Sequence, residues 1–210
     1  MAGSGVITPR HGTHRVIGIM GGVASGKTTV AEMLGSFGVK VVDADKIGHG
    51  LLSKPEIREK LVRKWGEGIL DEGGEVDRGK LSRLVFSDAE ALGELNDILH
   101  PLILEVIRRE IASEEAKGDA RAVVLDAALL QETGLTGLCD LLVFVVAEDS
   151  VKRERAVKHR HWDPEDVARR ERFQASAEEK RKIAHYVINN NSSKEETLRQ
   201  VREFLDRFVL

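Results

Sequence analysis

The sequence of 210 residues holds a single cysteine, Cys139, and has no apolar run long enough to cross a membrane as a helix. One thiol cannot form a disulfide bond within the chain, which fits a reducing compartment, and we expect the protein in the cytoplasm. The longest strongly apolar run, 138–147, is interrupted by Asp140 and is much shorter than the roughly 20 residues of a membrane span. We therefore expect no membrane partner.

The first fourteen residues lack the apolar core of a secretory signal. They are rich in glycine, serine and histidine, and we expect residues 1–14 to form a disordered extension. An amphipathic transit peptide is the alternative.

An excess of positive charge is also missing. Lysine and arginine number 32 against 35 aspartate and glutamate, a net charge of −3 with neutral histidines. Nucleic-acid-binding domains usually carry a strong basic excess, so we expect no nucleic-acid partner. Hydrophobic residues make up 41% of the chain, enough to bury a core, and the length suits one domain or a core with an inserted subdomain.

Short apolar runs separated by segments of helical pattern predict an α/β fold. The predicted strands are 16–20, 39–43, 122–126, 141–147 and the weaker 186–189. Runs that are apolar on both faces are typical of a mostly parallel sheet flanked by helices and joined by right-handed crossovers. The gap from 46 to 118 is longer than a crossover needs, so we expect an inserted helical subdomain there. Capping signals predict helix starts at Asp163, Ser176 and Ser193, the last two as capping boxes.

A glycine-rich segment follows the first predicted strand. Gly21, Gly26, Lys27 and Thr28 match the spacing G-x-x-x-x-G-K-[ST], and a helix predicted over 28–37 places them between strand and helix, as a phosphate-binding loop requires. In such a loop the backbone N–H groups surround phosphate oxygens, the lysine reaches the β- and γ-phosphates, and the threonine hydroxyl binds Mg²⁺. The string N-K-x-D that a GTPase uses for guanine is absent, so we expect a P-loop NTPase fold that binds ATP with Mg²⁺. The residues expected to hold the nucleotide are Gly21, Gly22, Val23, Ala24, Ser25, Gly26, Lys27, Thr28 and Thr29.

Carboxylates stand at the ends of two other predicted strands. Asp43 and Asp45 follow the second strand, and Asp126 ends the third. The carboxyl ends of parallel strands face one ligand crevice, so these side chains should share it with the glycine loop. We assign Asp45 to orienting an acceptor hydroxyl and taking its proton, and Asp43, Asp126 and Thr28 to Mg²⁺. The structural alternatives are a helix cap for one of the pair and a turn residue for Asp126.

Basic residues outnumber acidic ones between 151 and 182. Arg153, Arg155 and Arg160 follow the fourth predicted strand, beside His159 and His161. A short arginine-bearing helix over the phosphate site would neutralise charge during transfer and exclude water, and Arg155 is the residue that we expect to do so. The alternative is an ordinary solvated helix face.

Several segments together resemble the dephospho-CoA kinase family. "GGVASGKTTVAEMLGSFGVKVVDADKIGH" resembles the opening loop and DAD strand end of that family, and "LHPLI" at 99–103 resembles its His-Pro motif. "DAALLQETGL" resembles its D-x-P-L-L-[FY]-E segment, "RERAV" falls on its lid, and "FQASAEEKRKIAHYVINN" resembles its C-terminal motif. The resemblance covers about 16–210, nearly the whole chain.

The resemblance implies ATP-dependent phosphorylation of the ribose 3′-hydroxyl of dephospho-CoA, the final step of coenzyme A biosynthesis. It implies a P-loop core with a helical CoA-binding insert at about 46–118 and a helical lid at about 150–172, in a monomer or small homo-oligomer. Carried over by position, it makes Asp45 the base, Lys27 a phosphate ligand and Arg155 the lid arginine, and it puts Asn190 at the nucleotide. The residues that it assigns to dephospho-CoA are Asp45, His49, His100, Leu129 and Glu132.

The sequence departs from the family pattern outside the glycine loop. The departures are Ala128 and Gln131 in the acceptor segment, His159 in the lid, and His185 and Ser192 around the last strand. They bear on the acceptor pocket and the adenine contacts. Two other functions stay open: another P-loop kinase of small molecules, such as a nucleoside or nucleotide kinase, and a non-catalytic module that binds ATP to regulate a partner.

Overall fold

The computed structural model describes residues 15–160 and 163–209. The predicted extension 1–14, His161 and the side chains of His159 and Arg160 lie outside the described part. The chain divides into two compact units, one of them Ala44–Arg108 and the other formed by the segments up to Asp43 and from Arg109 onward. Each unit is described by itself below.

The first unit is built on a five-stranded sheet. Its strands are β1 (Arg15–Gly21), β2 (Lys40–Asp43), β3 (Ala122–Asp126), β4 (Leu141–Val146) and β5 (Tyr186–Asn189). Their order is β2-β3-β1-β4-β5, and every neighbouring pair is parallel. This confirms the predicted fold class, and each predicted strand end agrees with the structure within one residue.

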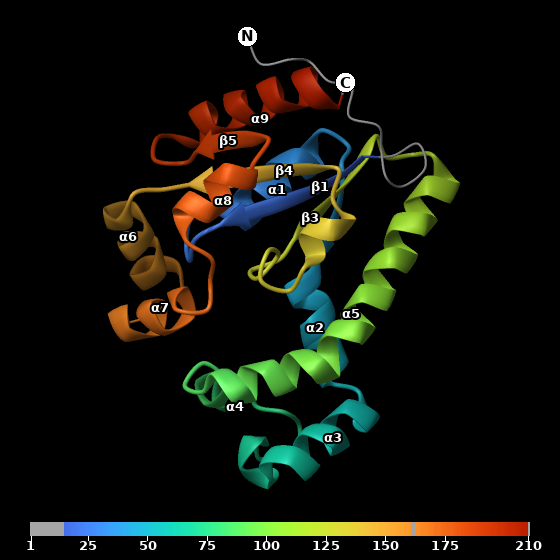
Figure 1. Cartoon of the computed structure of the whole chain (residues 1–210), viewed down its shortest axis with the longest axis vertical. Helices are drawn as coiled ribbons and strands as arrows, with labels where there is room; N and C mark the ends of the chain where they lie inside the picture. Colours follow the sequence, from blue (N-terminus) through green and yellow to red (C-terminus); the bar gives the residue numbers. More distant parts are fainter. Residues whose placement is uncertain (1–14, 161–162, 210) are drawn as a thin grey trace. The chain divides into compact units, whose positions relative to one another are not determined.

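Helices cover the sheet because its strands are apolar on both sides. Figure 1 shows α1 (Lys27–Ser36) and α9 (Lys194–Phe208) close together beside the strands, where Leu34 and Phe204 join Ile17 and Ile19 in the main core. Gly18 lies between the two isoleucines, so its missing side chain points to the other face of β1. A Cβ there would come within 2.7 Å of Cys139 Sγ, so the chain before β4 packs directly on the strand. The short helices η2 (Leu135–Leu138) and α8 (Ala177–Ile183) also contact β1.

The segment after β4 forms α6 (Asp149–Arg160), α7 (Pro164–Glu171) and then α8. Asp163 caps α7 by accepting a hydrogen bond from the Asp166 N–H at 2.7 Å, as predicted, and Ser176 forms the predicted capping box with Glu179. The box predicted at Ser193 is only half correct. Ser193 Oγ accepts from the Glu196 N–H, but the Glu196 carboxylate bonds Arg199 instead, because a guanidinium one turn along gives a charge-assisted pair.

The second unit is helical. It contains α2 (Ala44–Leu52), α3 (Pro55–Trp65), η1 (Glu67–Ile69), α4 (Arg78–Val85) and the first part of α5 (Ala89–Lys117). The glycine-rich stretch between η1 and α4 is a turn closed by a bridge between Leu70 and Val76, and Asp71 stabilises it by accepting from the N–H groups of Gly73 and Glu75. Among the described residues, no helix has both the length and the apolar character of a membrane span.

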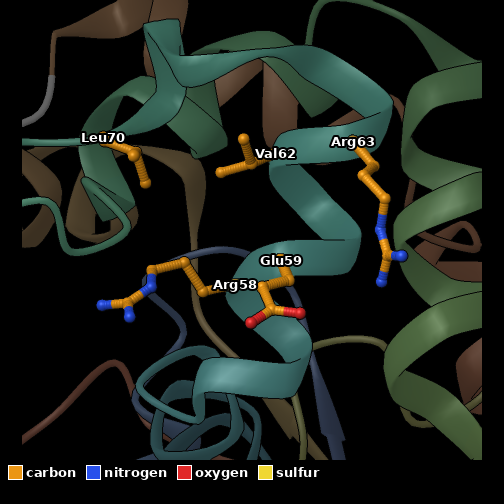
Figure 2. A pocket seen from close by; sticks show the side chains of 5 residues that line it. All are labelled: Arg58, Glu59, Val62, Arg63 and Leu70. Atoms are coloured by element: carbon orange, nitrogen blue, oxygen red, sulfur yellow. The ribbon is translucent and has the colours of Figure 1, made fainter.

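The second unit carries a pocket of about 350 Å³, lined by four residues of α3 and by Leu70. Figure 2 shows the guanidinium groups of Arg58 and Arg63 pointing to opposite sides of Val62. Arg58 is held by the Gly74 carbonyl and the Glu75 carboxylate of the turn. The pocket is open, and of the charged residues that line it Arg58 is bonded within the second unit.

Candidate active site

The glycine loop connects the end of β1 to the start of α1. Ala24 and Gly26 have positive φ angles of 55° and 93°, which turn the backbone into a cradle. A Cβ at Gly21 would lie 2.4 Å from Ser25 Oγ and 2.9 Å from the Val145 carbonyl oxygen, so only glycine fits where the loop leaves the sheet. The sequence thus folds this segment into the shape that a phosphate group needs.

The start of α1 leaves backbone donors available at the loop. No side chain caps the helix at Gly26, and the first-turn N–H groups of a helix have no carbonyl partner inside it. Such N–H groups, with the positive end of the helix dipole, form an anion site. Lys27 Nζ donates to the carbonyl oxygens of Gly21 and Gly22, both at 3.1 Å, so its ammonium lies over the loop. The neighbouring Thr28 is exposed.

Two carboxylates meet at the carboxyl end of the sheet. Asp43 on β2 is the register partner of Asp126 on β3, and Asp126 in turn lies opposite Ile19 of β1, two residues before the loop. Asp126 is 6% exposed and Asp43 is half-buried. Carboxylate and hydroxyl oxygens are the donors that Mg²⁺ prefers, so this pair with Thr28 fits that ion. Residues 15–160 and 163–209 contain no group of three or more His, Cys, Asp or Glu that could hold a metal ion.

Three predicted acceptor residues belong to the unit Ala44–Arg108. Asp45 and His49 are one turn apart on α2 and both are exposed, so they share one face of this helix. The Nε2 atom of His49 lies 3.0 Å from Nη2 of Arg78. His100 is on α5, and its buried Nε2 has no hydrogen-bond partner within the described part of the chain.

The predicted lid arginine, Arg155, contacts the glycine loop. Arg155 on α6 donates through Nη1 to the Ser25 carbonyl at 3.4 Å and through Nη2 to the Asn190 carbonyl at 2.9 Å. Val23 of the loop also packs with Ala156 of α6 and with α7 in a small buried cluster. The structure therefore brings the predicted lid residue to the loop through its backbone.

Lys152 is a loop neighbour that the sequence analysis missed. Its Nζ lies 3.7 Å from where a Cβ on Gly22 would stand, and it forms ion pairs with Asp149 at 2.6 Å and Glu171 at 3.3 Å. Burial disfavours its charge, but the hydrogen bond to Asp149 and the charge of Glu171 outweigh burial and raise the pKa of Lys152. It thus stays a cation at the loop. Lys152 stands three residues before Arg155 on the same helix, and this spacing could have predicted that both side chains face the loop.

The acceptor segment after β3 is tied to the chain that follows α7. Glu132 Oε1 accepts from the Ala175 N–H at 2.6 Å and lies 3.3 Å from Nζ of Lys180, which is only 3% exposed. The Ala128 carbonyl accepts from Nε2 of Gln174 at 3.1 Å. Glu132 is therefore bonded within the protein. Leu129, also assigned to the acceptor, is half-buried in the same segment.

His185, which departs from the family pattern, forms two hydrogen bonds with Leu142 of β4. His185 precedes β5, and its Nδ1 accepts from the Leu142 N–H at 3.0 Å while its own N–H donates to the Leu142 carbonyl at 2.8 Å. The imidazole thus supplies a side-chain acceptor for a backbone N–H of β4.

We expect Glu132→Gln to lower the free energy of unfolding by about 1–3 kcal/mol, because the buried Lys180 ammonium loses its counter-charge. Urea unfolding measures the change. Glu178→Gln, which removes the exposed partner of Lys182 on the same helix, is the matched control and should change stability by less than about 1 kcal/mol. Equal changes in the free energy of unfolding for the two substitutions would show that the buried pair stabilises the protein no more than the exposed pair.

Comparison with known proteins shows the family of this chain. The family model described as dephospho-CoA kinase matches residues 15–196. A dephospho-CoA kinase from Aquifex aeolicus is 40% identical over 197 residues, covering 92% of this chain and 97% of its own. A crystal structure of a Thermus thermophilus protein is 34% identical with a TM-score of 0.77, covering 93% of this chain and 97% of its own. A structure titled dephospho-CoA kinase from Campylobacter jejuni is 22% identical with a TM-score of 0.62, covering 94% and 98%, and it supports the fold alone.

The matched residues include the whole glycine loop, the carboxylate pair and the helices α6 and α7. The resemblance read from the sequence motifs is therefore confirmed, and the chain belongs to the dephospho-CoA kinase family.

Proposed function

We propose that the protein transfers the γ-phosphoryl group of ATP to the ribose 3′-hydroxyl of dephospho-CoA, giving ADP and CoA. The observation that carries this proposal is a complete phosphate loop beside the carboxylates at the end of β2 and β3, in a chain that belongs to this family. The 3′-hydroxyl oxygen forms a bond to the γ-phosphorus, the bond from that phosphorus to the bridging oxygen of ADP breaks, and the hydroxyl proton passes to a carboxylate.

Each loop residue has a role that follows from its place. The backbone N–H groups of the cradle and of the first turn of α1 hold the phosphates, and Lys27 stabilises the charge that moves to the leaving oxygen. We assign the carboxylates Asp43 and Asp126, with the Thr28 hydroxyl, to Mg²⁺. When bound, this ion would supply positive charge that stabilises the phosphates during transfer.

The acceptor side is assigned to the helical insert and the segment after β3. Asp45 orients the acceptor hydroxyl and accepts its proton late in a loose transition state. His49, His100 and Leu129 contact dephospho-CoA. Because Glu132 already bonds Ala175 and Lys180, we propose that it shapes the acceptor segment in place of contacting the substrate.

We also propose that Arg155 keeps water from the transferring group as the lid closes, through its helix α6. A cytoplasmic enzyme that is a monomer or small homo-oligomer, with no nucleic-acid partner, fits this assignment. The insert at about 46–118 then supplies the CoA site, and 150–172 supplies the lid.

With Mg²⁺ and ATP, dephospho-CoA should be converted to CoA with one ADP per turnover, while AMP, gluconate and shikimate should be poor acceptors. The physical reason is that the acceptor hydroxyl must be held in line with the γ-phosphate, which only a fitted substrate allows. A coupled ADP-release assay with each acceptor, and mass measurement of the product, test this expectation. Turnover of AMP without turnover of dephospho-CoA would favour a nucleotide kinase, and ATP binding without any turnover would favour a regulatory module.

A further inference from the structure

Asn190, between β5 and α9, has each of its polar groups bonded within the protein. Its N–H donates to the Val146 carbonyl at 2.8 Å, and its Nδ2 donates to the Ser25 carbonyl at 2.8 Å. Its Oδ1 accepts from the Thr197 hydroxyl at 3.0 Å, and its own carbonyl accepts from Arg155 at 2.9 Å. The residue is 6% exposed. A side chain that reads a nucleotide base directs a donor or acceptor toward the ligand, whereas both polar atoms of this amide bond the protein.

The bond to the Ser25 carbonyl of the glycine loop fixes the orientation of the Asn190 amide. The atom 2.8 Å from the Ser25 carbonyl oxygen must be a donor, because two acceptor oxygens at that distance repel each other. The amide also approaches Gly26 so closely that a Cβ there would lie 2.1 Å from Nδ2. Glycine at 26 is therefore required by Asn190 as well as by its positive φ.

The Ser25 carbonyl receives two donors, Asn190 Nδ2 and Arg155 Nη1. A trans peptide is planar, so its C=O and N–H point in opposite directions, and the described residues contain no cis peptide. Holding the Ser25 oxygen on the side of Asn190 and Arg155 therefore directs the Gly26 N–H to the other side. That N–H is one of the backbone donors of the glycine cradle.

We propose that Asn190 is a positioning residue for the phosphate loop: it fixes the peptide between Ser25 and Gly26 so that the Gly26 N–H faces the nucleotide phosphates, and it does not read adenine. This inference rests on the proposed function, since it takes ATP as the ligand of the loop. It revises the contact with the nucleotide that the sequence assigned to Asn190. Thr197, fully buried in α9, holds the amide from behind.

The test separates phosphate from base by comparing ADP with inorganic tripolyphosphate, each measured by calorimetry with Mg²⁺. Asn190→Leu keeps the size of the side chain and the backbone bonds to Val146 and Arg155, but removes the donor to Ser25. We expect the dissociation constants of ADP and of tripolyphosphate to rise by the same factor, about 10- to 100-fold. Asn191→Ala, at the next position, removes a hydrogen bond to the Glu148 N–H and none to Ser25, so it is the control and should stay close to the unsubstituted protein for both ligands.

Two results would overturn the inference. Weaker binding of ADP with unchanged binding of tripolyphosphate would mean that Asn190 contacts the nucleoside. Equal weakening in Asn191→Ala would mean that any change in this turn loosens the loop. Thermal unfolding without ligand checks the fold of each variant, and Asn190→Ala, expected to weaken both ligands equally, replaces the leucine variant if that one does not fold. An unsubstituted protein that fails to bind tripolyphosphate would instead overturn the phosphate site, and with it both proposals.

Discussion

Asp45→Asn is expected to lower kcat for CoA formation by about 10²- to 10⁴-fold, the usual range for loss of a general base. The substitution keeps the size and shape of the side chain, but an amide cannot take a proton from the acceptor hydroxyl. The contact strengthens as the proton leaves, so the loss should appear in kcat more than in KM. ATP affinity should change little, because the glycine loop and Lys27 hold the phosphates. Steady-state kinetics give kcat, and calorimetry gives the affinity for ATP.

Asp43→Asn is the matched comparison, since Asp43 stands two residues earlier and is assigned to Mg²⁺. We expect a smaller fall in kcat, which added Mg²⁺ partly restores, whereas Mg²⁺ should not restore Asp45→Asn. An inactive Asp43 variant beside a nearly normal Asp45 variant would reverse the two roles. Full activity in both would place the acceptor base elsewhere.

Lys27→Ala is expected to lower kcat by at least ~100-fold, by analogy with removal of one preorganised donor to developing charge. In the structure the Lys27 ammonium lies over the glycine loop, where it donates to the Gly21 and Gly22 carbonyls. Lys27 is also the first residue of α1, whose N-terminus lies at the end of the same loop. A fixed cation there stabilises the transferring phosphoryl group more than the bound ATP, so kcat falls further than the affinity for ATP. The measurement is kcat at saturating ATP and dephospho-CoA.

Lys182→Ala serves as the control for lost positive charge. Lys182 is an exposed lysine of α8 paired with Glu178, and its removal should leave kcat unchanged. Near-normal kcat in Lys27→Ala would show that Lys27 does not lie at the phosphates. A fall in kcat for both lysine variants would point to net charge as the cause.

The sequence alone predicted the strands, the glycine loop and the family because these depend on local signals. Strands buried on both faces read as continuous apolar runs, as at β3, where all five residues are buried. In the loop, Gly26 has a positive φ that residues with a Cβ rarely adopt, and Gly21 has no room for a Cβ, so glycines at a fixed spacing mark the segment in the sequence. Asp163 and Ser176 cap helices through partners three residues away, and those predictions were correct.

What the sequence did not decide is which polar side chains face a ligand and which face the protein. The motif assigns Glu132 to dephospho-CoA, and only the tertiary structure shows that its Oε1 accepts from the Ala175 N–H and lies 3.3 Å from Lys180 Nζ, both more than forty positions away. The sequence analysis did not place Lys152 at the loop, because only the fold shows that it lies beside Gly22.

The phosphate loop illustrates both what the sequence determined and what only the tertiary structure decided. Its spacing, glycines and lysine determine by themselves that the segment can surround a phosphate, because backbone angles and helix polarity are properties of neighbouring residues. The direction of the Ser25 carbonyl is fixed by Asn190, 165 positions away, and by Arg155, 130 positions away. Only the tertiary structure brings these donors together, because hydrogen bonds of that separation depend on the parallel sheet that sets β5 beside β4 and β4 beside β1.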